Sequence, residues 1–124
     1  MTLIQHLLLQ LGEEGSEIQQ ATSKSIRFGL CDIYTHISED GKETVKKEMG
    51  DNRHRLVGEL NDLLALAEML VNLGVLPENW ESDDLKDQKK AKVLRYLRYS
   101  RKVGTLDQPL GKEMSAIGLL LYDE

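Results

Sequence analysis

The 124-residue chain has few cysteines, prolines and aromatic residues: one cysteine, two prolines and 5% aromatics. A single cysteine, Cys31, excludes an intramolecular disulfide and a Cys-x-x-Cys zinc site, so we expect a reduced, cytoplasmic protein. No apolar run approaches the roughly 20 residues that a membrane-spanning helix needs. The N-terminal residues lack the basic segment of a signal peptide, so we expect no membrane partner.

The residues that are abundant favour helices. Apolar residues make up 40% of the chain, enough for a core, and Leu, Glu, Lys and Gln lose little rotamer freedom in a helix. Their spacing predicts an all-α bundle, as one domain over residues 1–124, with three long helices near 2–28, 52–73 and 83–102. Residues 30–50 are irregular and fit a short hairpin, a short helix or a mobile loop. An apolar segment at 114–122 predicts a short C-terminal element that packs back on the bundle.

Charge is concentrated rather than spread evenly. Residues 1–85 hold seven basic and 16 acidic side chains, whereas residues 86–104 hold eight basic and one acidic. An acidic body with one basic helix argues against a nucleic-acid-binding domain, which is usually basic throughout. The basic helix over 86–102 nevertheless keeps open a second interpretation, a non-catalytic module that binds nucleic acid or assembles with a partner.

Two groups of carboxylates lie at helical spacing. Glu13, Glu14 and Glu17 form E-E-x-x-E in the first helix, and Glu59 and Asp62 form E-x-x-D in the second. Residues three apart differ by about 60° round a helix, so each pair shares a face. Leucines place the second pair in a buried stripe, where unpaired carboxylates are costly. Such an oxygen-rich site suits Mg²⁺ or Mn²⁺, although a solvated face explains either pair taken alone.

These motifs, in the order L-G-E-E-G-S-E-I (11–18) and G-E-L-N-D-L-L (58–64), resemble those of the MazG-like all-α nucleoside triphosphate pyrophosphohydrolases. That superfamily carries EExxE on one helix and ExxD on the next, and binds Mg²⁺ with them. The resemblance covers residues 3–75 and extends loosely to the third helix. The 41 residues between Glu17 and Glu59 exceed the usual spacing, and the excess falls in the irregular region.

The resemblance implies hydrolysis of a (d)NTP to the monophosphate and pyrophosphate, with two or more Mg²⁺ or Mn²⁺ ions. It implies that Glu14, Glu17, Glu59 and Asp62 bind metal. Glu13 and Glu14 are the implied catalytic residues, and Glu13 either holds a further ion or positions the attacking water.

The run S-K-S-I-R-F-G (23–29) is similar to phage enzymes of this superfamily, some of which act on dGTP and GTP. This resemblance favours a guanine nucleotide as substrate and the host cytoplasm as location, with pyrimidine deoxynucleotides as the main competitors. Phe28, Asn61 and Tyr96 are the candidates for contacting base or sugar.

Basic residues are expected to complete a phosphate site. Lys24 lies seven residues after Glu17 and about 20° from it round the helix, so the two share a face. Arg27 follows near the helix end. Lys92 and Arg95 resemble the basic helix that contacts phosphates in the superfamily, although a helix end suited to the macrodipole explains them too.

A chain this short offers few apolar partners for a four-helix-type core, and leucines near its start leave spare apolar surface. We therefore expect a homodimer or homotetramer with active sites near the subunit contacts.

Overall fold

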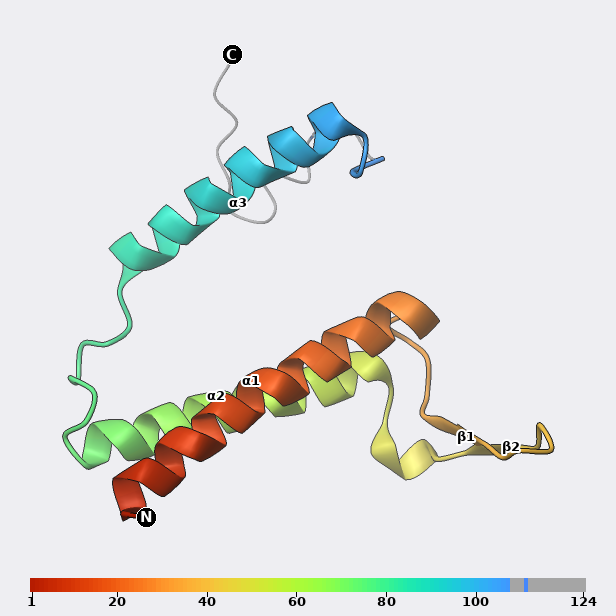
Figure 1. The fold of residues 1–124 in the computed structure, drawn as a ribbon, viewed down its shortest axis with the longest axis horizontal. Coiled ribbons are helices and arrows are strands. Elements are labelled where there is room, and N and C mark those ends of the chain that lie inside the picture. Colours follow the sequence, from red (N-terminus) through yellow and green to blue (C-terminus); the bar gives the residue numbers. More distant parts are fainter. Residues whose placement is uncertain (108–110, 112–124) are drawn as a thin grey trace. The chain divides into compact units, whose positions relative to one another are not determined.

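The computed structural model describes residues 1–107 and residue 111, and the predicted element at 114–122 lies outside them. The chain divides into two compact units, Met1–Pro77 and Glu78–Glu124, and each is described by itself. The elements are α1 (Leu3–Phe28), β1 (Thr35–Ile37), β2 (Glu43–Val45), the 3₁₀ helix η1 (Lys47–Met49), α2 (Asn52–Asn72) and α3 (Asp83–Val103) (Figure 1). The predicted helical fold is confirmed. Within the described part of the chain, no helix is long and apolar enough to cross a membrane.

Side-chain caps fix where the helices begin. Thr2 and Gln5 form a capping box, in which each side chain accepts a hydrogen bond from the other's backbone N–H (3.1 and 2.8 Å). Asp51 caps α2 and Ser82 caps α3 more simply, since each side chain accepts a hydrogen bond from one backbone N–H, that of His54 and of Leu85 respectively. Gly104, with φ of +83°, ends α3 in the left-handed conformation that glycine adopts without strain.

The first unit is an antiparallel pair of helices with a hairpin at one end. α1 and α2 pack along their length, so the start of α1 lies beside the end of α2 (Figure 1). Their interface buries Leu7 and Ala21 from α1 and Ala67 and Leu70 from α2, and Leu70 is fully buried. Two facing helices cover only one side of each other, which leaves the rest of both apolar surfaces exposed.

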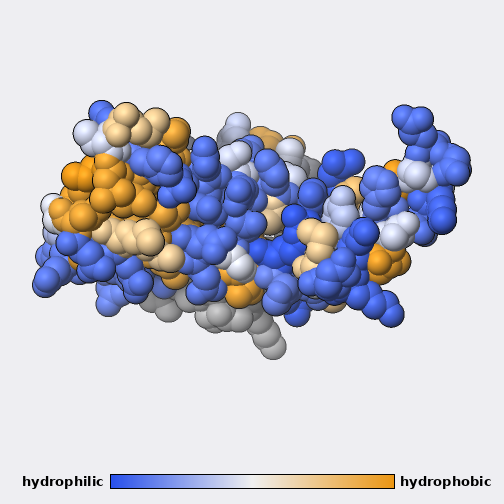
Figure 2. Space-filling model, turned by 90° about the horizontal axis from the view of Figure 1, so that it is seen from below, coloured by the Kyte–Doolittle hydropathy of each residue, from blue (hydrophilic) through white to orange (hydrophobic). Residues whose placement is uncertain are grey.

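Exposed apolar side chains gather where α1 begins and α2 ends (Figure 2). They include Leu3, Ile4, Leu8, Leu9, Met69 and Leu73, each of them 40% or more exposed. The buried apolar side chains of α2 are therefore few, and Leu60, Leu64 and Met69 are exposed. The exposed surface is the spare apolar surface that the sequence predicts.

The irregular region contains a short antiparallel hairpin, the first of the three possibilities that the sequence leaves open. In it, His36 of β1 lies opposite Thr44 of β2. Two backbone hydrogen bonds tie the segment before the hairpin to the start of α2, from Asn52 N to Asp32 O and from Arg53 N to Leu30 O, both 3.0 Å. The hairpin is therefore held at the end of the helix pair.

Asn52 is the buried polar residue of this unit, with 4% of its surface exposed. Its Nδ2 donates to the backbone oxygen of Gly29 (2.8 Å) and makes a longer contact with the backbone oxygen of Lys24 (3.5 Å). These contacts join the end of α1 to the first residue of α2. They also fix the register between the two helices.

Gly12 and Gly15 lie inside α1, where each costs about 1 kcal/mol relative to alanine. Such residues suggest either a close helix contact or the approach of a ligand to the backbone. A Cβ atom at either position would meet no atom within 4 Å among the described residues, so helix packing does not require these glycines.

Candidate metal centre

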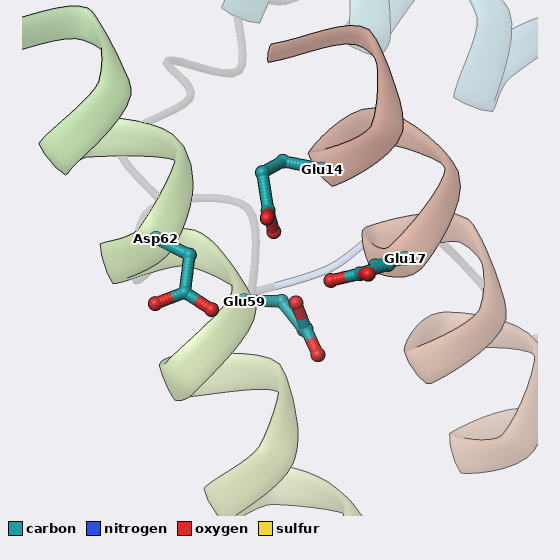
Figure 3. Close-up of side chains that lie close together, drawn as sticks. All are labelled: Glu14, Glu17, Glu59 and Asp62. Carbon is teal, nitrogen blue, oxygen red and sulfur yellow. The ribbon is translucent and has the colours of Figure 1, made fainter. Parts of the chain in front are cut away.

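Four carboxylates meet between the two helices, midway along their length. Glu14 and Glu17 come from α1, and Glu59 and Asp62 come from α2 (Figure 3). One oxygen from each side chain lies within 4.8 Å of the corresponding oxygens of the other three. Because α1 and α2 run antiparallel, the i, i+3 spacing on each helix brings two carboxylates to the same level of the pair.

Two carboxylate oxygens of the cluster residues are buried without a partner. Glu14 Oε2 and Glu59 Oε2 are shielded from solvent, and neither has a hydrogen-bond partner among the described residues. Ionised carboxylates can only accept hydrogen bonds, so carboxylates cannot satisfy one another while all of them are deprotonated. A buried, unpaired carboxylate oxygen is costly, and this cost indicates that a cation or a proton belongs in the cluster.

The pKa values reflect the same crowding. A hydrogen bond from protonated Glu59 to Glu17, burial and the negative charge of Glu17 raise the pKa of Glu59 to about 7. Burial, followed by the charge of Glu17, also raises the pKa of Glu14. Like charges held close together disfavour ionisation of each other, so the cluster without a cation takes up a proton near neutral pH.

The prediction that Glu59 and Asp62 both lie in a buried stripe is wrong for Asp62. Glu59 is half-buried, whereas Asp62 is exposed. The apolar stripe of α2 packs against α1, and residues at its margin, such as Met69 and Leu73, are themselves exposed. The cluster is therefore closed on the side of Glu14 and Glu59 and open on the side of Glu17 and Asp62.

The donor set fits a hard divalent cation. Mg²⁺ binds oxygen ligands at 2.0–2.1 Å, so two oxygens on opposite sides of it lie about 4 Å apart. The carboxylate oxygens, at 4.8 Å or less, need only a small movement to reach that separation. A cation would also supply the partner that Glu14 Oε2 and Glu59 Oε2 lack. Carboxylate oxygens favour Mg²⁺ or Mn²⁺ over softer metals.

The predicted phosphate and base residues of α1 lie toward its end. Lys24 is half-buried, with Nζ 5.7 Å from the ring centre of Tyr34. Arg27 places its guanidinium 4.9 Å from the ring centre of Phe28, which is itself 56% exposed. Lys24 and Phe28 both line a cavity beside the hairpin, so the structure brings these two predicted residues together.

The remaining predicted residues are all exposed. Glu13 is exposed and does not belong to the four-carboxylate cluster. Asn61 is exposed, and its Nδ2 donates to the backbone oxygen of Val57 (2.8 Å). The candidates in α3 belong to the second unit, where all are exposed: Lys92, Arg95 and Tyr96.

The cavity beside the hairpin also contains residues that the sequence did not single out for binding. Asp32, Tyr34, Thr35, Ile37, Glu43 and Asn52 line it together with Lys24 and Phe28. All but Asn52 come from the irregular region, whose fold the sequence left open. Aromatic and acidic residues on both sides of a polar turn were the sequence feature that could have indicated a binding site in this region.

Comparisons with family models, with curated proteins and with solved structures each return no match to this chain.

Proposed function

We propose that this chain is a Mg²⁺- or Mn²⁺-dependent nucleoside triphosphate pyrophosphohydrolase that converts a (d)NTP to the monophosphate and pyrophosphate. The observation that carries the proposal is the pair of buried, unpartnered oxygens on Glu14 and Glu59, one from each helix. Together with Glu17 and Asp62, these two side chains place four carboxylates within reach of one cation. The order of the motifs, EExxE and then ExxD, resembles the MazG-like enzymes and supports the same reaction.

The chemistry requires no covalent nucleophile. The oxygen of one water bonds to the α-phosphorus, the bond from that phosphorus to the oxygen bridging to the β-phosphorus breaks, and pyrophosphate leaves. A divalent cation, when bound, neutralises charge on the phosphates and lowers the pKa of a bound water. Glu14, Glu17, Glu59 and Asp62 would hold it. A triphosphate is itself negative, so an all-carboxylate cluster repels it unless cations lie between them.

The proposal also assigns residues outside the four-carboxylate cluster to the attacking water and to the phosphates. Glu13 is exposed next to Glu14 and accepts a proton from the attacking water or holds a further ion. Lys24 lies two helical turns beyond Glu17, about 10 Å along α1, and contacts phosphate oxygens. Arg27, Lys92 and Arg95 are further candidates for phosphate contacts. Two or more ions per site are part of the proposal, because several phosphate charges must be neutralised.

The test is a panel of the eight common (d)NTPs, each incubated with Mg²⁺ or Mn²⁺ and scored for monophosphate and pyrophosphate by anion-exchange chromatography. We expect one or a few of them to be hydrolysed at the α–β bond, and only with metal. Release of inorganic phosphate and a diphosphate, or no hydrolysis of any nucleotide, would contradict the proposal.

Matched variants make the test specific to the cluster. Glu59→Gln and Asp62→Asn should abolish turnover, since each removes a charge that the metal requires. Glu68→Gln is the control because Glu68 is an exposed acid on α2, nine residues after Glu59, and therefore points away from the cluster. Turnover should be unchanged in this control.

The second candidate function is binding of nucleic acid or of an acidic partner through α3. α3 carries Tyr96 and Tyr99, 61% and 59% exposed, among its basic residues. Exposed tyrosines beside lysines and arginines offer stacking and phosphate contacts. Binding of single-stranded DNA by the wild-type protein, together with a complete lack of nucleotide hydrolysis, would favour this candidate.

A further inference from the structure

The cavity beside the hairpin lies a defined distance along the helix pair from the four carboxylates. Lys24 lies seven residues after Glu17 on α1, and Asn52 lies seven residues before Glu59 on α2; both line the cavity. Seven residues correspond to a rise of about 10 Å and nearly two full turns, so each lies on the same face as its carboxylate. A nucleotide with its phosphates at the carboxylates would place its base at this end of the pair.

The size of the cavity fits a base rather than a whole nucleotide. Its volume is about 290 Å³, at the lower limit of ligand pockets. Such a space holds a ring system and part of a sugar and leaves the phosphates outside. Phe28 and Tyr34 supply aromatic surface to it, and Ile37 supplies an apolar contact. Aromatic side chains can bind a heteroaromatic ring by stacking.

The cavity is also lined by two carboxylates whose side chains make no hydrogen bond or ion pair with the described residues. Asp32 and Glu43 line it, and neither side chain has a hydrogen-bond or ion-pair partner within the part of the chain that the structure describes. Carboxylates accept hydrogen bonds and donate none when ionised. A ligand held by them must therefore present donors on its edge.

Among the common bases, guanine presents a ring N–H and an amino group side by side, which one carboxylate can accept together. Adenine and cytosine present an amino group next to an acceptor nitrogen, and uracil and thymine present one N–H between two carbonyl groups. A carboxylate facing any of these four bases meets an acceptor as well as a donor.

We propose that the hairpin cavity binds the base of the nucleotide, and that Asp32 and Glu43 select guanine through its two adjacent donors. This inference rests on the proposed function for the placement of the phosphates, whereas the base contacts depend only on the cavity. The hairpin is thus the specificity element of the chain. Asn52 positions it by joining the end of α1 to the start of α2.

Kinetics test the inference in the active protein. We expect dGTP or GTP to be preferred, and Asp32→Asn or Glu43→Gln to reduce the preference over dATP by about tenfold or more, the loss expected for a hydrogen bond to a charged group. Glu39→Gln is the matched control because Glu39 lies exposed in the hairpin turn and does not line the cavity. An unchanged ratio in both cavity variants would overturn the proposal.

A binding measurement separates the cavity from the hydrolysis. Guanosine, adenosine, cytidine and uridine are titrated without metal into the wild-type protein and into Asp32→Asn, and amide NMR shifts are followed. Guanosine should shift residues 28–37 of the wild type most strongly, and the Asp32→Asn variant should lose this response. If guanosine binds but no nucleotide is hydrolysed, the proposed function fails and the cavity assignment holds. If nucleotides are hydrolysed but guanosine shifts nothing near Tyr34, the cavity assignment fails alone.

Discussion

The buried side chain of Asn52 donates a hydrogen bond over 2.8 Å to the backbone oxygen of Gly29, and so ties the first residue of α2 to the C-cap of α1. Both helices therefore leave this junction in a fixed register. Two turns further along α2, that register brings Glu59 close to Glu14 and Glu17 of α1. The position of the acidic cluster is a consequence of this bond and of the leucine packing beyond it.

Asn52→Ala should destabilise the first unit. The substitution removes the part-buried hydrogen bond from the buried Asn52 side chain to the Gly29 carbonyl, and loss of one such bond costs about 0.5–1.5 kcal/mol. Urea denaturation followed by circular dichroism measures the change in the free energy of unfolding. Asn61→Ala is the control: the Asn61 amide makes an exposed bond within its own helix, so we expect a change within about 0.5 kcal/mol. Equal stability of the two variants would remove Asn52 from its anchoring role.

The metal-free protein should become less stable as the pH rises toward neutrality, relative to Glu59→Gln. The pKa of Glu59 is about 7 when folded, against an ordinary value of 4.5. Between these values the folded state binds more protons than the unfolded state, so protonation of Glu59 stabilises the fold. This contribution is complete below about pH 4.5, decreases as the pH rises and is lost above about pH 7.

Denaturation of both proteins at several pH values in the presence of a chelator measures the difference between them. The glutamine variant lacks this titration, so it should gain stability relative to wild type from pH 4.5 to 7.5. Excess Mg²⁺ should oppose the trend in the wild type, because the metal binds the deprotonated carboxylates. A constant difference at every pH would contradict the crowding of charges around Glu59.

Lys24→Ala should weaken turnover of all triphosphates by a similar factor. Phosphates are common to every nucleotide, and loss of one hydrogen bond to a charged group costs roughly 1.5–3 kcal/mol. The ratio of kcat/KM between the preferred and a poor substrate should therefore survive, in contrast to the variants of Asp32 and Glu43. A large change in that ratio, or no loss with either substrate, would remove Lys24 from the phosphate site. Arg95→Ala tests the equivalent role in α3.

We propose that the exposed apolar surface of α1 and α2 is covered by other copies of the chain, as a dimer or a tetramer. Leu8 and Leu9 are 44% and 52% exposed near the start of α1, and Met69 and Leu73 are exposed near the end of α2. Light scattering at micromolar concentration should give a multiple of 14.1 kDa, and Leu8→Glu should shift the mass toward that of one chain. A monodisperse monomer of the wild type would contradict this prediction.

The sequence predicted the helices well because their ends carry local signals. Thr2, Asp51 and Ser82 are side-chain caps, and Gly29 and Gly104 lie where α1 and α3 end. Capping depends on neighbours in the chain, so it can be recognised without knowing the tertiary fold. The helix period likewise placed each carboxylate pair on one face.

The sequence could not predict features that depend on contacts between distant residues. The hairpin pairs short strands of three residues each, which carry too little periodicity to be recognised. The exposure of Asp62 depends on how much of the α2 surface α1 covers. The periodicity of the α2 sequence does not predict the width of that covered surface. The cavity brings Lys24 of α1 and Glu43 of β2 together only because the irregular segment folds into a hairpin. The sequence therefore did not indicate Asp32 or Glu43 as binding residues.

The most direct measurement of the central claim is a calorimetric titration of Mn²⁺ into the wild-type protein, Glu59→Gln and Glu68→Gln. The wild type and Glu68→Gln should bind Mn²⁺ with the same affinity, and Glu59→Gln should bind at least about tenfold more weakly, because one charged ligand is lost. Absence of Mn²⁺ binding by the wild type, or equal binding by all three proteins, would show that the four carboxylates do not form a metal centre.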